Sequence, residues 1–280
     1  MRIEFFGVRG SIPSPGPQTV YYGGNTSCVL VETDAGDLLI FDAGTGIRLL
    51  GQRLRKDKRT IHLLLSHQHW DHIQGLPFFT PIYQHDCKLH VYASSPKGMD
   101  VIALTQMSDP AFPVDANSLG SHIKIHNSHC RTYNIGTAKV LCKPLNHPGG
   151  GAAYIIEADG YRFGYATDNE LFPPEAPATS YEDWVKYFDG LDALVHDATY
   201  VEEELEETRG WGHSTVNQAV QLAIDARVKH LLLFHHDPDR SDEQLREIHD
   251  QACKYVVEKG GNTKVSVARE GLVLDLSDSG

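Results

Sequence analysis

The feature that most constrains this chain is a group of four potential metal ligands directly after a short apolar run. Residues 61–65 read as a buried strand, and the motif that follows is Ser66, His67, Gln68, His69, Trp70, Asp71 and His72. His67 and His69 are two residues apart, so at an extended strand end they point to one side. Asp71 and His72 are adjacent, so the chain must turn after the strand to bring both inward.

The ligand types in this motif indicate a divalent metal ion. Imidazole and carboxylate suit a borderline ion such as zinc, and a catalytic zinc site keeps one position open for water. Two imidazoles plus an Asp-His pair exceed what one such ion needs, so we expect half of a two-metal site. A chain with 16 His residues also clusters some of them by chance. The H-x-H-x-D-H pattern at a strand end favours the metal site.

The motif resembles the signature of the metallo-β-lactamase superfamily, and later motifs resemble its phosphodiesterase branch, which includes ribonuclease Z and cyclic-nucleotide phosphodiesterases. The resemblance implies an α/β fold, the αββα metallo-β-lactamase sandwich. About a dozen short strands interspersed with helices suit this fold, and we expect residues 1–280 to form a single hydrolase domain.

The periodicity and turn signals give the expected elements. Strands are predicted at 3–6, 28–31, 38–41, 61–65, 89–92, 140–144, 153–158, 161–166, 191–195, 230–234, 265–268 and 272–276. Helices are predicted at 78–83, 97–107, 216–228 and 241–258. The last helix has a capping box formed by Ser241 and Gln244.

Further ligand candidates follow predicted strands later in the chain. The resemblance implies that one metal is held by His67, His69 and His147, that a second is held by Asp71, His72 and His235, and that Asp168 bridges the two. His236 is adjacent to His235 and remains the alternative to it. The expected cofactor is therefore two divalent ions, zinc first, with manganese or iron as alternatives.

Two elements near the C-terminal half resemble the ribonuclease Z pattern of an acidic-Ala-Thr element followed by His-Ser-Thr. Asp197 begins the first element and His213 the second, and the resemblance places the His against the scissile phosphate. An imidazole with a pKa of about 6.5, held by a carboxylate, can stabilise charge or protonate a leaving oxygen. The other interpretation is a loop His that caps the next helix. We predict His213, Asp197 and Asp71 as catalytic residues.

Four further residues are predicted to bind substrate: Asn25, Gly149, Gly150 and Thr199. The two glycines follow His147, where flexible backbone could approach a phosphate through its N–H groups. Asp42, at another strand end, either orients a ligand His from behind or caps a helix that begins near Gly46.

The substrate prediction rests on the resemblance to enzymes that open 3′,5′-cyclic nucleotides, together with charge and one short segment. The net charge of −12 comes from 37 acidic and 25 basic residues, and it should repel a long polyanion. Ribonuclease Z enzymes carry a long tRNA-gripping arm, for which the segment between His147 and Asp168 has no room. We therefore expect a small phosphodiester and no large nucleic acid. The predicted reaction opens 3′,5′-cyclic nucleotides to monophosphates by metal-hydroxide attack, with degradation of cyclic-nucleotide signals as a role.

Three other functions stay open: a ribonuclease Z-like RNA phosphodiesterase, a diiron oxidoreductase, and a non-catalytic metal-binding protein of this fold. The chain starts without a signal-like segment and has no apolar run long enough to span a membrane, so we expect a cytoplasmic protein without a membrane partner. Five scattered cysteines predict reduced thiols. The resemblance implies a homodimer, with residues 108–115 as a dimer contact or a lid.

Overall fold

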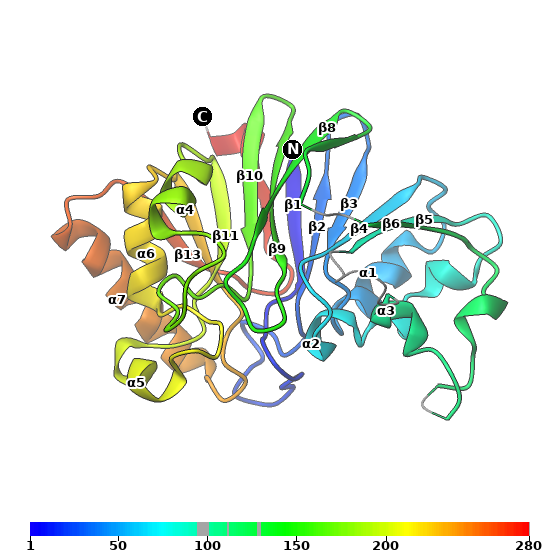
Figure 1. The fold of residues 1–280 in the computed structure, drawn as a ribbon, viewed down its shortest axis with the longest axis horizontal. Helices are drawn as coiled ribbons and strands as arrows, with labels where there is room; N and C mark the ends of the chain where they lie inside the picture. Colours follow the sequence, from blue (N-terminus) through cyan, green and yellow to red (C-terminus); the bar gives the residue numbers. More distant parts are fainter. Residues whose placement is uncertain (94–100, 111, 128–129, 280) are drawn as a thin grey trace.

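The computed structural model describes residues 1–93, 101–110, 112–127 and 130–279. Two seven-stranded sheets face each other, and helices cover their outer faces (Figure 1). The first sheet has the order β14-β1-β2-β3-β4-β5-β6, and the second has the order β13-β12-β11-β10-β9-β8-β7. This arrangement confirms the predicted αββα sandwich.

The described elements have the following bounds. The first sheet contains β1 (Arg2–Gly7), β2 (Cys28–Glu32), β3 (Leu38–Phe41), β4 (Ile61–Leu65), β5 (Lys88–Ala93), β6 (His122–Asn127) and β14 (Val273–Asp275). The second contains β7 (Tyr133–Ile135), β8 (Ala138–Pro144), β9 (Ala152–Ala158), β10 (Tyr161–Ala166), β11 (Ala193–Asp197), β12 (His230–Phe234) and β13 (Lys264–Val267). The helices are α1 (Ile47–Leu54), α2 (Trp70–Ile73), α3 (Ile102–Thr105), α4 (Tyr181–Tyr187), α5 (Leu205–Thr208), α6 (Val216–Asp225) and α7 (Asp242–Glu258). Short 3₁₀ turns are η1 (Leu76–Phe78), η2 (Thr80–Tyr83), η3 (Ala116–Ser118), η4 (Glu202–Glu204) and η5 (Leu276–Ser279).

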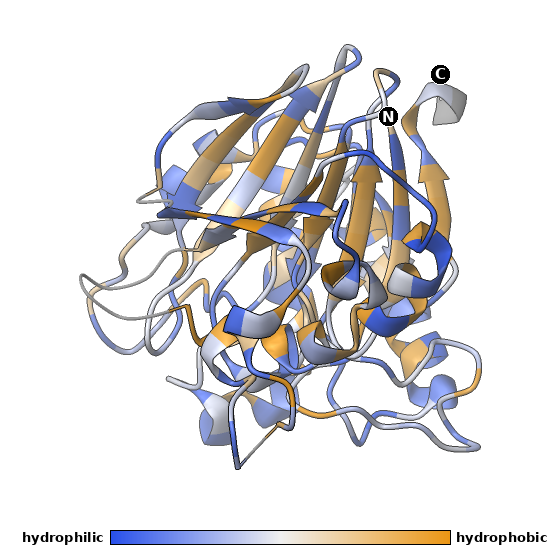
Figure 2. Ribbon diagram, turned by 90° about the vertical axis from the view of Figure 1, so that its right-hand side faces the viewer, coloured by the Kyte–Doolittle hydropathy of each residue, from blue (hydrophilic) through white to orange (hydrophobic). Residues whose placement is uncertain are grey.

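Three apolar layers hold the sandwich together. Aromatic side chains such as Phe41, Tyr165 and Phe234 are buried between the two sheets. The outer face of the second sheet packs against the apolar sides of α4, α6 and α7, and α1 covers the first sheet. The strands are accordingly the most hydrophobic part of the ribbon in Figure 2. Burial of this area supplies the main driving force for the fold.

Parallel strand pairing brings the ends of distant strands to one edge of the sandwich. Strands β3 and β4 are parallel, and so are β10, β11 and β12 in the facing sheet. Their carboxyl ends therefore lie on the same side of each sheet, where open α/β sheets bind ligands. Asp42, His67, Asp168, Asp197 and His235 are at or just beyond these ends.

Some elements differ from the prediction. The structure adds β6, β7, α2, α4 and α5, and it has the 3₁₀ turns η1 and η2 where a helix was predicted at 78–83. Of the helix predicted at 97–107 only Ile102–Thr105 is helical, while 97–100 lie outside the described residues. Helix α4 has only seven residues, too few for a clear apolar period, and is fixed by the buried Trp184 and the Ser180 cap. The capping box of α7 is confirmed.

One cysteine prediction is wrong. Cys130 and Cys142 form a disulfide, with their Cα atoms 4.6 Å apart, whereas Cys28, Cys87 and Cys253 are free. The antiparallel pairing of β7 with β8 brings the two cysteines together. Their spacing in the sequence carries no pattern that reveals this contact. Among the described residues, no helix is both long and apolar enough to cross a membrane.

Candidate metal centre

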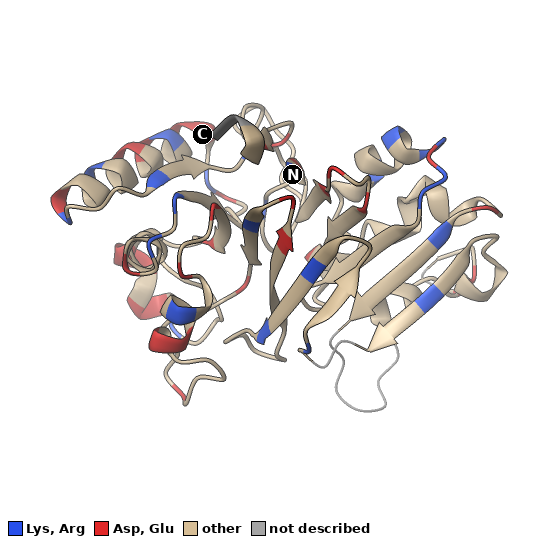
Figure 3. Ribbon diagram, turned by 90° about the horizontal axis from the view of Figure 1, so that it is seen from above, with Lys and Arg blue, Asp and Glu red and all other residues tan. Residues whose placement is uncertain are grey.

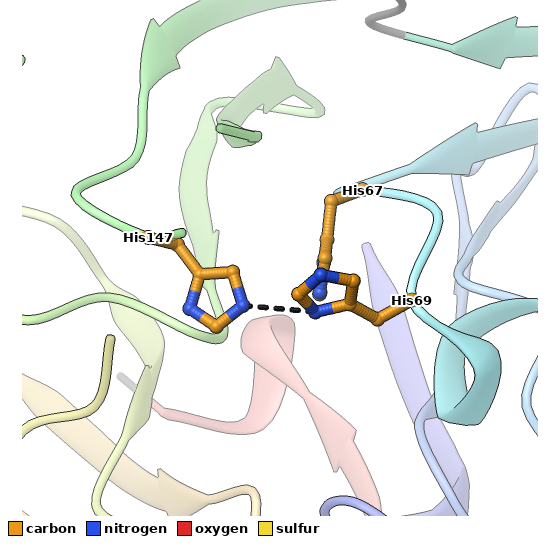
Figure 4. A group of neighbouring side chains, drawn as sticks. All are labelled: His67, His69 and His147. Carbon is orange, nitrogen blue, oxygen red and sulfur yellow. Dashed lines mark hydrogen bonds between the residues drawn. The ribbon is translucent and has the colours of Figure 1, made fainter. Parts of the chain in front are cut away.

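Three histidines form the first half of the candidate centre (Figure 4). His67 and His69 come from the segment after β4, and His147 comes from the loop after β8. The Nε2 atom of His147 lies 3.0 Å from the Nδ1 atom of His69. The centroid of the His67 ring lies 4.4 Å from that of His69 and 4.8 Å from that of His147. One nitrogen from each ring fits within the reach of a single ion.

The second half contains two carboxylates and two histidines, all buried: Asp71, His72, Asp168 and His235. The Oδ2 atom of Asp71 lies 3.1 Å from His72 Nε2 and 3.2 Å from His235 Nε2. Short helix α2 supplies the turn that brings the adjacent Asp71 and His72 inward. His235 has a left-handed φ of 59°, and it is this His that enters the centre. The alternative, His236, faces the Ala268 carbonyl at 2.8 Å.

Asp168 lies between the two halves. Its Oδ2 atom lies 3.6 Å from His67 Nε2 and 3.8 Å from His147 Nε2, whereas its Oδ1 atom lies 3.2 Å from both His72 Nε2 and His235 Nε2. Each carboxylate oxygen therefore faces one group of imidazoles. This is the arrangement that the predicted bridging role requires.

The electrostatics of the centre follow from burial and from the closeness of these groups. Burial alone would raise the pKa of the Asp168 carboxyl, but His235, His72 and His67 hold that pKa well below its usual value. Burial lowers the pKa of His67, and the neighbouring His72 lowers it further. The carboxylates are thus anionic and His67 is neutral, as metal ligands must be.

Four of the histidines are oriented through their Nδ1 atoms. His72 Nδ1 donates to Asp42 at 2.8 Å, and His67 Nδ1 donates to the Ser66 hydroxyl at 3.1 Å. His235 Nδ1 donates to the Thr199 hydroxyl at 3.0 Å, and His147 Nδ1 donates to the Gly212 carbonyl at 3.0 Å. Each bond leaves Nε2 with its lone pair directed into the centre, as partners behind metal ligands usually do. Asp42 therefore orients a predicted ligand, and α1 has no side-chain cap.

The donor set fits two divalent ions. The Nε2 atoms of His67 and His72 are buried and have no hydrogen-bond partner among the described residues. Such atoms are costly unless a ligand satisfies them. Nitrogen donors together with two buried carboxylates match the preferences of zinc, manganese or iron. The positive charge of the ions would offset the negative charge of the carboxylates.

His213 and Asp197 form a pair beside the centre. The Nδ1 atom of His213 donates to Asp197 Oδ2 at 2.7 Å, and the His213 ring stacks on His235 at 4.9 Å. Burial would lower the pKa of His213, but the Asp197 carboxylate outweighs it and raises that pKa to about 9. Thr215, and not His213, caps α6. His213 therefore does not cap the helix, and the catalytic role of the pair stays a prediction.

The predicted substrate-binding residues have mixed surroundings. The Asn25 side chain donates to Glu270 at 3.0 Å. Gly149 has a φ of +84° and lies beside His69, and Gly150 lines a pocket of about 460 Å³ that also reaches His147. The Gly150 N–H, however, already donates to the His147 carbonyl. The proposed phosphate cradle therefore lacks this donor.

Thr199 contacts one of the predicted metal ligands. Its side chain is buried, and its hydroxyl donates to the His235 carbonyl at 2.8 Å while accepting from His235 Nδ1. Both bonds hold a predicted metal ligand, which is a positioning role for the hydroxyl. The substrate contact predicted for Thr199 stays a prediction.

The sequence analysis missed several residues that support the centre. The backbone N–H of Ser11 donates to Asp71 Oδ2 at 2.8 Å, and Ser66 connects Asp42 with His67. Glu170 is buried close to His147. Ser66 directly precedes His67, and Glu170 follows Asp168 by two residues, so the positions of both pointed to the site. Ser11 lies in a turn-rich loop, and nothing else in the sequence pointed to it.

Comparisons with known proteins agree with this geometry. The family model described as "Beta-lactamase superfamily domain" matches residues 38–236. A ribonuclease Z of Haloarcula marismortui is 25% identical over 282 residues, covering 84% of this chain and 86% of the relative. The structure of human tRNase Z, short form, has a TM-score of 0.67 at 19% identity and covers 99% of both chains. Zinc-bound PqqB from Methylobacterium extorquens has a TM-score of 0.67 at 18% identity and covers 98% of this chain and 100% of its own.

The family match spans most of the chain, and it includes the H-x-H-x-D-H motif, Asp168 and His235. The chain belongs to the metallo-β-lactamase superfamily.

Proposed function

We propose that this chain is a metal-dependent phosphodiesterase. The observation that carries the proposal is the position of Asp168 between two ligand groups, with the His213–Asp197 pair beside them. His67, His69 and His147 would hold one ion, Asp71, His72 and His235 a second, and Asp168 both. Two divalent ions held there would supply Lewis acidity for the phosphoryl group and would lower the pKa of water to about 7. We propose zinc, the ion named for PqqB.

The protein's own groups have separate roles in this reaction. His213, fixed by Asp197, is the residue that we place against a phosphoryl or leaving oxygen. The backbone N–H of Ser11 holds Asp71, and Asp42 holds His72, so the centre is formed before substrate binds. Such preorganisation is what a charged transition state requires.

The class of diester has two candidates. The relatives are named ribonuclease Z, and this favours an RNA substrate over the cyclic nucleotide that the sequence analysis placed first. The net charge of −12 and the short link from His147 to Asp168 favour a small cyclic nucleotide instead. Lys and Arg are scattered over the ribbon seen from above (Figure 3). We therefore rank RNA first and retain the cyclic nucleotide as the second candidate.

One panel of substrates tests both. The zinc-loaded protein is incubated with a precursor tRNA, a short RNA, and cyclic AMP, GMP, CMP and UMP. RNA cleavage with the cyclic compounds intact supports the first candidate, and loss of the cyclic compounds with RNA intact supports the second. If no diester is hydrolysed, the proposed function is wrong.

The His213→Ala variant separates the enzyme from a passive metal-binding protein or an oxidoreductase of this fold. We expect diester turnover to fall by about a hundredfold or more with zinc content unchanged, because a positioned charge-stabilising group contributes about that much. His85→Ala, which removes an exposed imidazole elsewhere, is the control. Unchanged turnover in His213→Ala would contradict the role of His213.

We also propose a homodimer, which the resemblance implied, and, as a separate proposal, a cytoplasmic location. Phe78 is exposed, and its ring centroid lies 5.8 Å from that of Phe112 in the loop at 108–115, the predicted contact segment. Residue 111 of this loop lies outside the described residues. Light scattering at micromolar concentration tests the dimer, and a monomer would contradict it.

A further inference from the structure

A buried glutamate connects three loops around the first half of the centre. Glu170 is 3% exposed, and it follows Asp168 by two residues. Its Oε1 atom accepts from the Gly210 N–H at 2.9 Å, and its Oε2 atom accepts from the Gly212 N–H at 3.0 Å. Both carboxylate oxygens are thus bound to backbone donors of one loop. A buried carboxylate kept in this way fixes the loop because losing its partners is costly.

The loop held by Glu170 contacts a predicted ligand directly. The Gly212 carbonyl accepts from His147 Nδ1 at 3.0 Å, so the ring proton lies on Nδ1 and Nε2 carries the lone pair. Gly212 has a φ of +91°, and a Cβ there would lie 2.1 Å from His147 Nδ1. Only glycine allows this approach, and it places the carbonyl against the ring.

The backbone of Glu170 holds the other side of the same histidine. Its N–H donates to the Asn146 carbonyl at 2.9 Å, and the Asn146 side chain donates back to the Glu170 carbonyl at 3.1 Å. Asn146 directly precedes His147. Glu170 therefore fixes both the main chain before His147 and, through Gly212, the proton on its ring.

We propose that Glu170 is a positioning residue for the metal centre, which sets the ring orientation and tautomer of His147 through the Gly212 carbonyl. The inference rests on the metal centre of the proposed function but not on its substrate. The segment from Asp168 to Glu170 would then have two roles. Asp168 faces both halves of the centre, whereas Glu170 acts on the first half alone.

The test is zinc binding by the metal-free protein, measured by competition with a chromophoric chelator. In Glu170→Gln one acceptor oxygen becomes an NH₂ group that faces a backbone N–H. We expect zinc affinity to fall by about 10- to 100-fold at the first half of the centre, the range for partners behind ligands, and to change by less than about twofold at the buried, carboxylate-rich second half, which we expect to be the tighter site. Glu175→Gln makes the same chemical change at an exposed position and should leave both sites unchanged.

A second readout reports the tautomer. Nitrogen NMR of the imidazoles, assigned with a His147→Gln variant, should show a proton fixed on Nδ1 in the native protein and a mixture in Glu170→Gln. Unchanged zinc affinities, an equal loss at both sites, or an unchanged tautomer would each overturn the proposal. If Glu170→Gln does not fold, Glu170→Asp keeps the charge with one methylene less, and the same pattern is expected at about tenfold. Turnover is not measured, so failure of the proposed function is seen separately.

Discussion

The two halves of the centre differ in burial and in charge. The first half has three imidazoles, and His69 is exposed, whereas the side chain of His147 is only 3% exposed. The second half has two carboxylates and two imidazoles, all four buried. Anionic ligands in a buried site attract a dication more strongly than neutral ones at the surface. We therefore expect the second half to bind zinc more tightly, and the first half to exchange it with solvent.

The difference has a structural origin in the sandwich. In the second half, Asp168 and His235 lie just beyond β10 and β12, the two neighbours of β11 in the second sheet, and Asp71 and His72 lie on α2. The first half takes His67 and His69 from the segment after β4 and His147 from the loop after β8. Loops are more exposed and more easily displaced than strand ends, so the same metal would be held with different rigidity.

The largest expected effect comes from removing the charge that the two halves share. Asp168→Asn keeps the shape of the side chain but replaces a carboxylate oxygen that faces one set of imidazoles. We expect diester turnover to fall by at least about a thousandfold, since metal-based charge stabilisation is worth several kcal/mol. Zinc analysis should show that both ions are bound more weakly. Asp189→Asn, which changes an exposed carboxylate, is the control. Full zinc content in Asp168→Asn would contradict the proposal that Asp168 serves both halves.

The tighter half is tested by a pair of adjacent histidines. His235→Gln should lower turnover by more than about a hundredfold and leave about one zinc per chain, because even partners behind ligands contribute about 10- to 100-fold. His236→Gln retains an amide that can donate to the Ala268 carbonyl and should bind two zinc ions. If the two variants exchange these outcomes, the assignment of His235 is wrong.

The exposed half should tolerate a change better. His69→Ala leaves His67, His147 and the Oδ2 atom of Asp168, so we expect about tenfold to a hundredfold weaker binding of one zinc and no change in the other. Chelator titration followed by zinc analysis measures both, with His85→Ala as the control. A loss of both ions at the same chelator concentration would show that the halves do not differ as proposed.

The smallest effect separates a positioning group from a substrate contact. Thr199→Val keeps the shape of the side chain and removes the hydroxyl that accepts from His235 Nδ1. We expect about tenfold weaker zinc binding in the second half and no change in KM for the diester at saturating zinc. A raised KM with unchanged zinc affinity would instead support the substrate contact predicted for Thr199.

Much of the fold and the ligand set could be predicted because the signals are local. A buried strand followed by H-x-H-x-D-H needs only the strand period and ligand chemistry to indicate a metal site. The helix at 241–258 could be predicted from its capping box and apolar face, and the structure begins it at Asp242. Element β7 and helix α4 were missed because each is too short to show a period.

Several contacts could not be predicted because they depend on the pairing of distant strands. The disulfide between Cys130 and Cys142 exists because β7 pairs with β8. The choice between His235 and His236 depends on which of two adjacent side chains faces the centre, and the positive φ of His235 decides it. No local pattern carries such information.

The sequence by itself determined the chemistry of this protein: which residue types end the strands, and that they suit two divalent ions. Only the tertiary structure decided how the ligands are held. Asp42 behind His72, Thr199 behind His235 and Glu170 behind the loop of Gly212 come from segments far from their partners in the chain. The physical reason is that ligand identity depends on single residues, whereas ligand orientation depends on hydrogen bonds that form only once the two sheets pack together.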